Sequence, residues 1–231
     1  IFHSNACQKD KGQHGALSKA RKWAACHDFY LKMDISKFFD SVDHAILKQM
    51  LYSRIKDKKV LVILFDIIES YNTAHGKGLP LGNLTSQYFA NFYLTRFDHW
   101  IKQAKKARFY LRYMDDMLIV GDKSMLCQLR DDSRQYLNND LKLHIKNGGQ
   151  INRTDKGIGF LGSVIYPGVL KLSSSSKKRI RVRIKQYEKK YRSKTMDALD
   201  LQERTNALWA GLYHINSYGW RKNLARKCMD I

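Results

Sequence analysis

The chain contains few residues that break or cross-link a fold. Its 231 residues include only two prolines and no glycine-rich run, which excludes collagen-like and linker-dominated proteins. No apolar run reaches the roughly 18–20 residues that a membrane span needs. The longest run, 60–68, is short and is interrupted by Asp66. We therefore expect a protein that does not associate with membranes.

The chain also has few cysteines, and their spacing suggests no shared role. Cys7, Cys26, Cys127 and Cys228 form no Cys-x-x-Cys pair, and none has a histidine at zinc-finger spacing. This pattern predicts four free thiols in a reducing compartment such as the cytoplasm. The start shows neither an initiator Met nor a secretion signal, so we expect the chain to begin within a longer protein.

Acidic residues are scarce relative to basic ones. Lys and Arg number 42 against 21 Asp and Glu, which gives a formal net charge of +21. The 44% hydrophobic and 12% aromatic residues indicate a packed globule rather than a disordered basic tail. A folded chain with this charge favours an anionic partner, most simply a phosphate backbone. A soluble protein with a solvated basic face is the alternative.

Hydrophobic periodicity predicts an α+β domain followed by a helical lobe. Four serines at 173–176 mark the boundary, and the segment 179–185 beyond them fits either a strand or a helix. The expected elements are a helix within 16–24, a strand over 29–35, helices from 41 and over 60–71, 86–105 and 124–138, and hairpins over 109–120 and 160–172.

Three aspartates stand at the ends of expected strands. Asp34 lies near the end of the first strand, and Asp115 and Asp116 occupy the tip of the first hairpin. Adjacent aspartates repel one another unless a cation lies between them. If the strands pair, the three carboxylates converge, as a two-metal phosphoryl-transfer site requires. An ordinary acidic turn is the alternative.

Four blocks of sequence resemble the motifs of one enzyme family. The box Tyr113-Met114-Asp115-Asp116 resembles the catalytic box of reverse transcriptases, and residues 34–44 resemble the first catalytic motif of bacterial retroelement enzymes. Residues 78–94 resemble the next block, and residues 159–162 resemble the block that ends the palm. The resemblance implies an RNA-directed DNA polymerase, a nucleotidyltransferase, encoded by a bacterium or phage.

The family fold is a right-hand polymerase, and the resemblance covers most of the chain. It implies partial fingers at 1–28, a palm with an antiparallel sheet at 29–172, and a helical thumb at 173–231. A fingers insert is expected within the palm at about 45–80.

The third block departs from the commonest pattern of the family. Group II intron and retron enzymes usually carry Gln-Gly-x-x-x-Ser-Pro there, whereas residues 81–87 read LGNLTSQ. This departure is similar to diversity-generating retroelement reverse transcriptases, as is the segment 5–17, and the Val-Thr-Gly typical of the retron thumb is absent. The resemblance implies copying of a template RNA into cDNA with errors at template adenines, for mutagenic retrohoming.

The resemblance also implies the metal ligands. Asp34 and Asp115 would ligate two Mg²⁺ ions, or Mn²⁺ in their place, with Asp116 as a weaker or outer ligand. The carbonyl of Ile35 would complete the shell of one ion. Lys146 roughly matches the palm lysine proposed to protonate the leaving pyrophosphate, which gives it a catalytic role.

Five residues are implied in dNTP binding. Lys9 and Lys11 would touch the triphosphate, although solvated loop lysines are an alternative. Phe39 would clash with a 2′-hydroxyl and so favour dNTPs, although a core phenylalanine is an alternative. Leu81 and Gly82 would lie beside the nascent base pair. Because Leu cannot supply the hydrogen bonds of the usual Gln, a looser fit there would reduce discrimination.

The remaining implied contacts are to nucleic acid. Arg179 and Arg183 belong to a tail, 171–231, that carries a net charge of +11 and can track a duplex backbone. The predicted template–primer contacts are Tyr113, Met114, Gln87, Arg179 and Arg183. The expected partners are template RNA, the cDNA or primer, dNTPs and, for the diversity-generating type, a small basic accessory protein that forms an oligomer.

Other functions compete with this interpretation. A retron-type or phage-defence reverse transcriptase is the nearest alternative, and an RNA-dependent RNA polymerase is another, against which Phe39 argues. From a different class, the chain could be a non-catalytic RNA-binding scaffold. Intact Asp34, Asp115 and Asp116 argue against a scaffold, because binding alone does not require clustered carboxylates on a basic surface.

Overall fold

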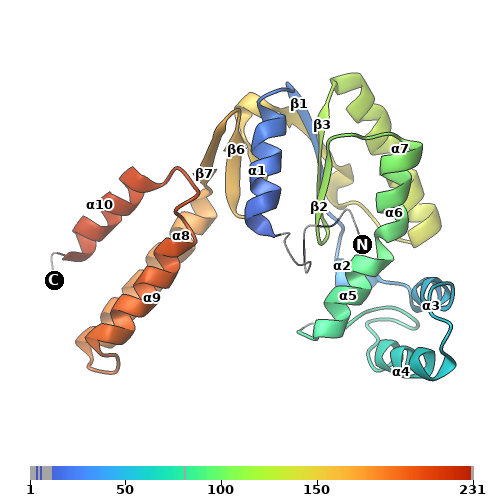
Figure 1. Ribbon diagram of the computed structural model, residues 1–231, viewed down its shortest axis with the longest axis horizontal. Helices are drawn as coiled ribbons and strands as arrows, with labels where there is room; N and C mark the ends of the chain where they lie inside the picture. The colour runs from blue at the N-terminus through green and yellow to red at the C-terminus, as the bar shows by residue number, and fades with distance from the viewer. Residues whose placement is uncertain (1–3, 5, 7–11, 81, 230–231) are drawn as a thin grey trace.

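The computed structural model describes residues 4, 6, 12–80 and 82–229. Its fold is α+β, as the sequence predicts, with two antiparallel sheets and helices around them (Figure 1). Among the described residues, no helix combines the length and the apolar character needed to cross a bilayer. Cys26 and Cys127 are free thiols, in agreement with the expectation for these two cysteines.

The larger sheet has four strands in the order β2-β3-β1-β4. The strand β1 lies between β3 and β4 and pairs antiparallel with both, so it is the centre of the sheet. The sequence did not predict β4, because three of its four side chains are exposed and polar. The strands are β1 (Phe29–Met33), β2 (Tyr110–Tyr113), β3 (Asp116–Gly121) and β4 (Gln150–Arg153).

A second, three-stranded sheet continues the chain after β4. It has the order β5-β6-β7, and its last two strands form the expected second hairpin. Its first strand pairs with β6 from Ile158 to Phe160, so the hairpin gains a third strand. The strands are β5 (Ile158–Phe160), β6 (Ser163–Tyr166) and β7 (Val169–Leu172).

Seven α-helices and a π-helical turn precede the second sheet in the described chain. They are α1 (Gln13–Ala24), α2 (Phe38–Ser41), α3 (His44–Tyr52), α4 (Lys58–Glu69), α5 (Leu84–Tyr93), α6 (Thr95–His99), the π-helical turn Trp100–Ala104, and α7 (Lys123–Leu141). Short 3-10 turns lie at Lys146–Gly148 and Thr154–Lys156.

The prediction of one continuous helix over 86–105 is wrong. The segment divides at Leu94 into α5 and α6, and the π-helical turn follows. The Thr95 hydroxyl donates a hydrogen bond of 2.6 Å to the carbonyl of Phe92. Such bonds from Ser or Thr to the preceding turn bend helices, which hydrophobic periodicity does not reveal.

Side chains alternate between the two faces of the four-stranded sheet, and each face builds its own core. Leu31 and Ile119 lie on one face, in a core shared with α3, α5, α6 and α7. Tyr30 and Leu118 lie on the other face, in a core shared with α1 and the three-stranded sheet. The sheet is therefore buried on both sides, which fixes its register.

The C-terminal lobe consists of α8 (Ser174–Arg192), α9 (Ala198–Ala210) and α10 (Tyr218–Met229). The segment 179–185, which fitted two conformations, is helical. Ser173 caps α8 by accepting a hydrogen bond from the amide of Ser176 at 3.1 Å, and basic residues fill the last turn. Leu212 and Ile215 are buried in the second core, and they attach the lobe to the sheets.

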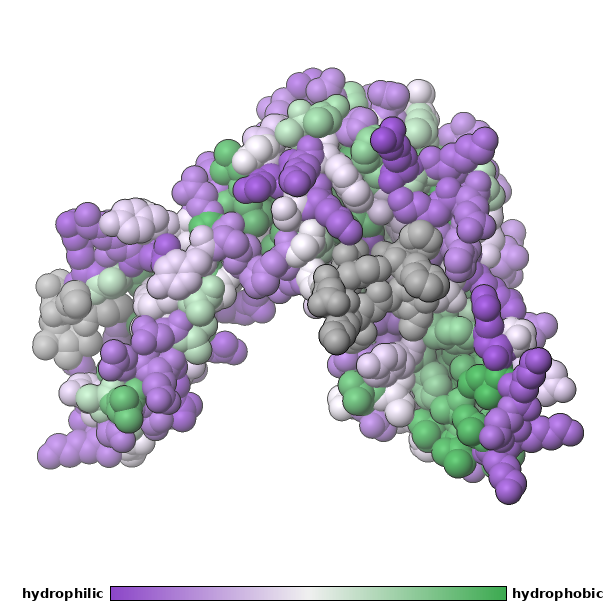
Figure 2. Space-filling model, viewed as in Figure 1, coloured by the Kyte–Doolittle hydropathy of each residue, from purple (hydrophilic) through white to green (hydrophobic). Residues whose placement is uncertain are grey.

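The molecule has the shape of an arch. Figure 1 shows the sheets at the top, α3, α4 and α5 in one limb, and α8 and α9 in the other. Figure 2 shows the open hollow between the limbs, with hydrophilic residues over the C-terminal limb and a hydrophobic surface on the opposite limb. Val60, Val62 and Ile63 of α4, which belongs to that limb, are exposed.

The tight approach of β5 to β6 generates a prediction about stability. Gly157 has φ +89°, and a Cβ there would lie 2.7 Å from Val164 Cγ1. We expect Gly157→Ala to lower the free energy of unfolding by about 2 kcal/mol or more, because it adds both backbone strain and a clash. The midpoint of urea unfolding measures this loss. Gly159→Ala is the control, since a Cβ there meets nothing within 4 Å. Equal losses in both variants would contradict the explanation.

Candidate active site

Strand pairing brings the three aspartates to one end of the sheet. The antiparallel register pairs Met33 of β1 with Met117 of β3. Asp34 follows Met33 directly, and Asp116 precedes Met117, so both lie where these neighbouring strands meet. Asp115 stands in the two-residue loop that joins β2 to β3. The expected convergence depends on the pairing of β1 with β3, and this pairing is present in the structure.

The electrostatics show that these carboxylates are crowded. Burial raises the pKa of Asp115, and the nearby charge of Asp34 adds to the effect. Burial also raises the pKa of Asp116, to about 6, against the opposing attraction of Lys32. The charges of Asp34 and Asp115 raise it further. A group of acids held in this way gains stability when a cation neutralises it.

Two lysines lie beside two of the three carboxylates, Asp116 and Asp34. Lys32 Nζ lies 3.2 Å from Asp116 Oδ1, and Lys146 Nζ lies 4.0 Å from Asp34 Oδ2. No three His, Cys, Asp or Glu side chains of the described chain lie close enough together to hold a metal ion. The expected three-carboxylate site is therefore not closed in this arrangement.

The donor atoms nevertheless suit a hard divalent cation. Asp116 Oδ1 is buried and makes no hydrogen bond of good geometry, even to the neighbouring Lys32. A buried oxygen without a hydrogen-bond partner is costly, and a metal ion would satisfy it. Carboxylate oxygens are the ligands that Mg²⁺ prefers. The residues that fit such an ion are Asp34, Asp115 and Asp116.

A backbone bridge at Ile35 places Lys146 beside the carboxylates. Ile35 forms an antiparallel bridge with Ile145, in which the amide of Lys146 donates to the carbonyl of Asp34 at 2.8 Å. The second bond of the bridge, from the amide of Ser36 to the carbonyl of His144, leaves the Ile35 carbonyl outside the bridge. Together with Lys32, Asn147 and Gln150, Asp34 and Lys146 line a cavity of about 210 Å³.

Lys32 is a site residue that sequence reasoning missed. Its ammonium also donates to the carbonyl of Gly159 on β5, at 2.8 Å. Alternation along β1 was the available signal, because Lys32 lies two residues before Asp34 and therefore on the same face of the strand.

Two predicted dNTP-binding positions lie on adjoining segments. Phe39 is on α2 and packs partly buried against the first core, with its ring centroid 5.8 Å from that of Phe38. The amide of Leu79 donates to the carbonyl of Phe39 at 2.8 Å, which ties α2 to the loop that leads to Gly82. Gly82 has φ +86° and open space around it. Lys9, Lys11 and Leu81 lie outside the described residues.

The predicted template–primer residues occupy two regions. Gln87 is exposed on α5, while Tyr113 and Met114 directly precede Asp115 and Asp116, with Tyr113 partly buried against the second core. Arg179 and Arg183 are on the other limb, exposed on α8.

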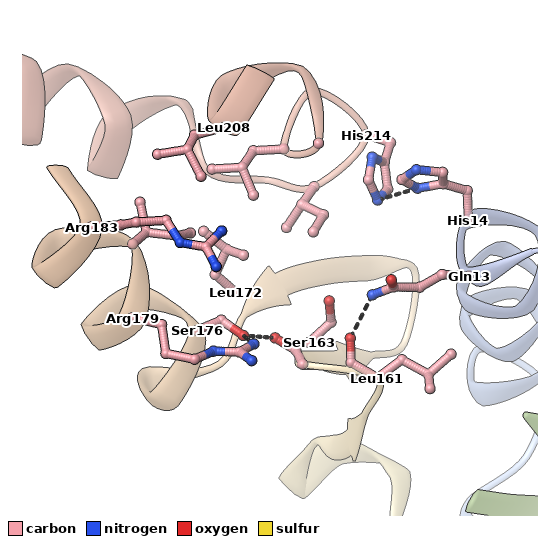
Figure 3. A pocket seen from close by; sticks show the side chains of 15 residues that line it. Gln13, His14, Leu161, Ser163, Leu172, Ser176, Arg179, Arg183, Leu208 and His214 are labelled. Carbon is pink, nitrogen blue, oxygen red and sulfur yellow. Dashed lines mark hydrogen bonds between the residues drawn. The ribbon is translucent and has the colours of Figure 1, made fainter. Parts of the chain in front are cut away.

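Arg179 and Arg183 line a pocket of about 340 Å³ between α1, the second sheet and the C-terminal lobe (Figure 3). His14 of α1 and His214 of the lobe meet at its edge, with 2.6 Å between Nδ1 and Nε2. Burial lowers the pKa of His214, and the charge of His14 adds to the effect. The sequence pattern does not indicate this pair, because 200 residues separate its members.

A protein family model matches the first two thirds of the chain. The model of the family described as reverse transcriptase (RNA-dependent DNA polymerase) matches residues 2–152. Protein YkfC of Escherichia coli strain K12 is 25% identical over 169 residues, which cover 56% of this chain and 44% of YkfC. The group II intron-encoded protein LtrA of Lactococcus lactis subsp. cremoris is 25% identical over 109 residues, covering 44% of this chain and 18% of LtrA.

Solved structures show the same fold. The apo telomerase from Candida tropicalis matches with a TM-score of 0.58 at 14% identity, over 80% of this chain and 41% of that one. The telomerase from Candida tropicalis in complex with a TWJ fragment of telomeric RNA matches with a TM-score of 0.54 at 14% identity, over 84% and 40%. The chain spans less than half the length of each of these relatives.

The expected right-hand polymerase fold is therefore confirmed by the α+β architecture and its structural neighbours. Because the family model covers residues 2–152 of 231, the chain belongs to the reverse transcriptase family.

Proposed function

We propose that the chain is the polymerase part of an RNA-directed DNA polymerase that copies a template RNA into cDNA. The observation that carries this proposal is the gathering of Asp34, Asp115 and Asp116 at the paired ends of β1 and β3, within the fold of the family. The +21 charge supports a polyanionic substrate. A scaffold that only binds RNA has no use for three gathered carboxylates, in which burial and neighbouring negative charge raise the pKa values of Asp115 and Asp116.

The proposed chemistry is phosphoryl transfer to a primer 3′-hydroxyl. Asp34, Asp115 and Asp116 would hold two Mg²⁺ ions, which supply charge neutralisation for the triphosphate and the attacking oxygen. Lys146, 4.0 Å from Asp34, would place a proton donor beside the leaving pyrophosphate. Lys32 would orient Asp116 until the metal ions bind.

The proposed domains follow the two limbs of the arch. Residues 29–172 would form the palm, with part of the fingers inserted at about 45–80, and residues 1–28 would contribute to the fingers. The lobe 173–231 would be the thumb, since α8 carries Arg179 and Arg183 on an exposed face. Template and primer would lie in the hollow between the limbs (Figure 2).

We also propose the diversity-generating retroelement type, on the basis of the motif at 81–87. In this type the cDNA carries errors at template adenines, and a basic accessory protein oligomer assists. Leu81 in place of Gln is the residue that carries the proposal, because it removes two hydrogen-bonding groups beside the nascent pair.

The catalytic role of the hairpin aspartates is testable with an isosteric change. We expect Asp115→Asn to reduce primer extension on an RNA template at least about a thousandfold, because it removes several kcal/mol of charge stabilisation. Incorporation of dNTPs with Mg²⁺ measures the rate. Asp131→Asn is the matched control, since this carboxylate of α7 is exposed. Extension by Asp115→Asn at the wild-type rate would show that the catalytic assignment is wrong.

The role of Phe39 is testable through sugar selectivity. We expect Phe39→Ala to lower the ratio of kcat/KM for a dNTP over the matching NTP by about ten- to a hundredfold, because the ring no longer excludes the 2′-hydroxyl. Phe39→Tyr keeps the ring and should keep the ratio. If Phe39 serves only the core, Phe39→Ala will lower the melting temperature and leave the ratio unchanged.

The role of Leu81 is testable through the error spectrum. We expect Leu81→Gln to reduce misincorporation opposite template adenine by about tenfold, the value of one hydrogen bond of roughly 1–1.5 kcal/mol. Sequencing of cDNA made on a defined RNA template measures the errors. Leu84→Gln is the control, because Leu84 is an exposed leucine on α5. Adenine errors that persist in Leu81→Gln would remove the support for this type.

A further inference from the structure

A buried ion pair lies behind the catalytic hairpin. The side chain of Arg112, on β2, is fully buried, and that of Asp98, on α6, is 2% exposed. Arg112 donates from Nε to Asp98 Oδ1 at 2.7 Å and from Nη2 to Asp98 Oδ2 at 2.5 Å. The hydroxyl of Tyr110 also donates to Asp98 Oδ1, at 2.7 Å. Three hydrogen bonds therefore fix this carboxylate.

Stability alone does not account for such a pair. The desolvation of two buried charges offsets most of their attraction, and well-packed apolar residues often serve stability as well or better. The pair does have one property that apolar residues lack. It fixes the guanidinium in a single orientation, so that the remaining N–H groups point in set directions.

One of those N–H groups reaches the turn that carries Asp115, and the others meet Asn91. Arg112 Nη1 donates to the carbonyl of Met114 at 2.9 Å and to Asn91 Oδ1 at 3.1 Å. Met114 is the residue directly before Asp115, and it has φ +56°. Left-handed backbone is costly for a side chain of this size, and it persists only where the surroundings hold it. Arg112 supplies one of the bonds that hold it.

Asn91 supplies a second contact to the same residue. Its Nδ2 group lies 3.2 Å from Met114 Sδ, and its Oδ1 accepts from Arg112 and, at 2.9 Å, from the Ser4 hydroxyl. Asn91 belongs to α5, one helical turn after Gln87. A direct chain of contacts therefore runs from α5 through Asn91 to the backbone before Asp115.

We propose that Arg112 and Asn91 are positioning residues for Asp115, and that they couple the placement of α5 to the geometry of the catalytic turn. The inference rests on the proposed polymerase function for its kinetic consequence. Its structural part, the support of Met114 by these two side chains, is independent of the reaction. A shift of about 1 Å in a catalytic group lowers a rate by up to a hundredfold, so small losses of support have large effects.

The variants separate positioning from stability. Arg112→Lys keeps a positive charge for Asp98 but lacks the planar fork that reaches Met114 at the same time. Asn91→Ala keeps the Arg112–Asp98 pair and removes the three contacts of the amide, with Arg112, Met114 and Ser4. Tyr93→Phe is the matched control on α5, because the buried Tyr93 hydroxyl donates to the carbonyl of Leu141 at 2.8 Å, away from the turn.

Steady-state kinetics on an RNA template gives the first readout. We expect kcat to fall at least tenfold in Arg112→Lys and in Asn91→Ala, with KM for the dNTP within threefold of wild type. The double variant should lose less than the product of the two single losses, because both act on one turn. Tyr93→Phe should lower the melting temperature and keep kcat. Equal kcat in all the folded variants would overturn the proposal.

The methyl resonance of Met114 gives a readout that needs no activity. In protein labelled with ¹³C at the methionine methyls, Met114→Leu assigns this resonance. We expect Arg112→Lys and Asn91→Ala to shift or broaden it, and Tyr93→Phe to leave it in place. An unchanged resonance in both variants would overturn the structural part. Wild-type protein that makes no cDNA would instead refute the proposed function, while the methyl spectra would still decide whether these residues position the turn.

Discussion

The antiparallel pairing of β1 with β3 is the interaction on which the rest of the structure depends. It places the end of β1 beside the β2–β3 turn and thereby gathers three carboxylates from segments about 80 residues apart in sequence. The same pairing creates two core-forming faces, because alternate residues of both strands point to opposite sides. A shift of register by one residue would exchange these faces and separate Asp34 from Asp116. The burial of both faces prevents that shift.

Crowding of charge is the cost of this arrangement, and the surrounding residues offset it. Lys32 lies against Asp116, and Lys146 lies near Asp34. Lys32 also bonds to β5, so one ammonium group joins the carboxylates to the second sheet. Behind the turn, Arg112 brings another positive charge, which is itself paired with Asp98. The acids therefore meet cationic groups on several sides, and these groups help to fix their positions in the fold.

Much of this site could be predicted from sequence, because its key residues lie at the ends of strongly patterned strands. Asp34, Asp115 and Asp116 follow or precede apolar runs, and the family motifs place Lys146 near them. Residues whose role depends on tertiary contacts were missed. Lys32 and Arg112 are ordinary basic residues of strands in sequence, and only the folded chain shows that one bonds to β5 and the other is buried. Similarly, the break at Leu94 depends on a local hydroxyl bond that hydrophobic periodicity does not encode.

The two helices on either side of the break share one buried arginine. Asn91 on α5 and Asp98 on α6 both bond to the guanidinium of Arg112. These residues are seven positions apart, which is close to two helical turns, so they lie on the same side of the segment. The same guanidinium also donates to the carbonyl of Met114. One buried arginine therefore connects the α5 limb of the arch to the turn that carries Asp115.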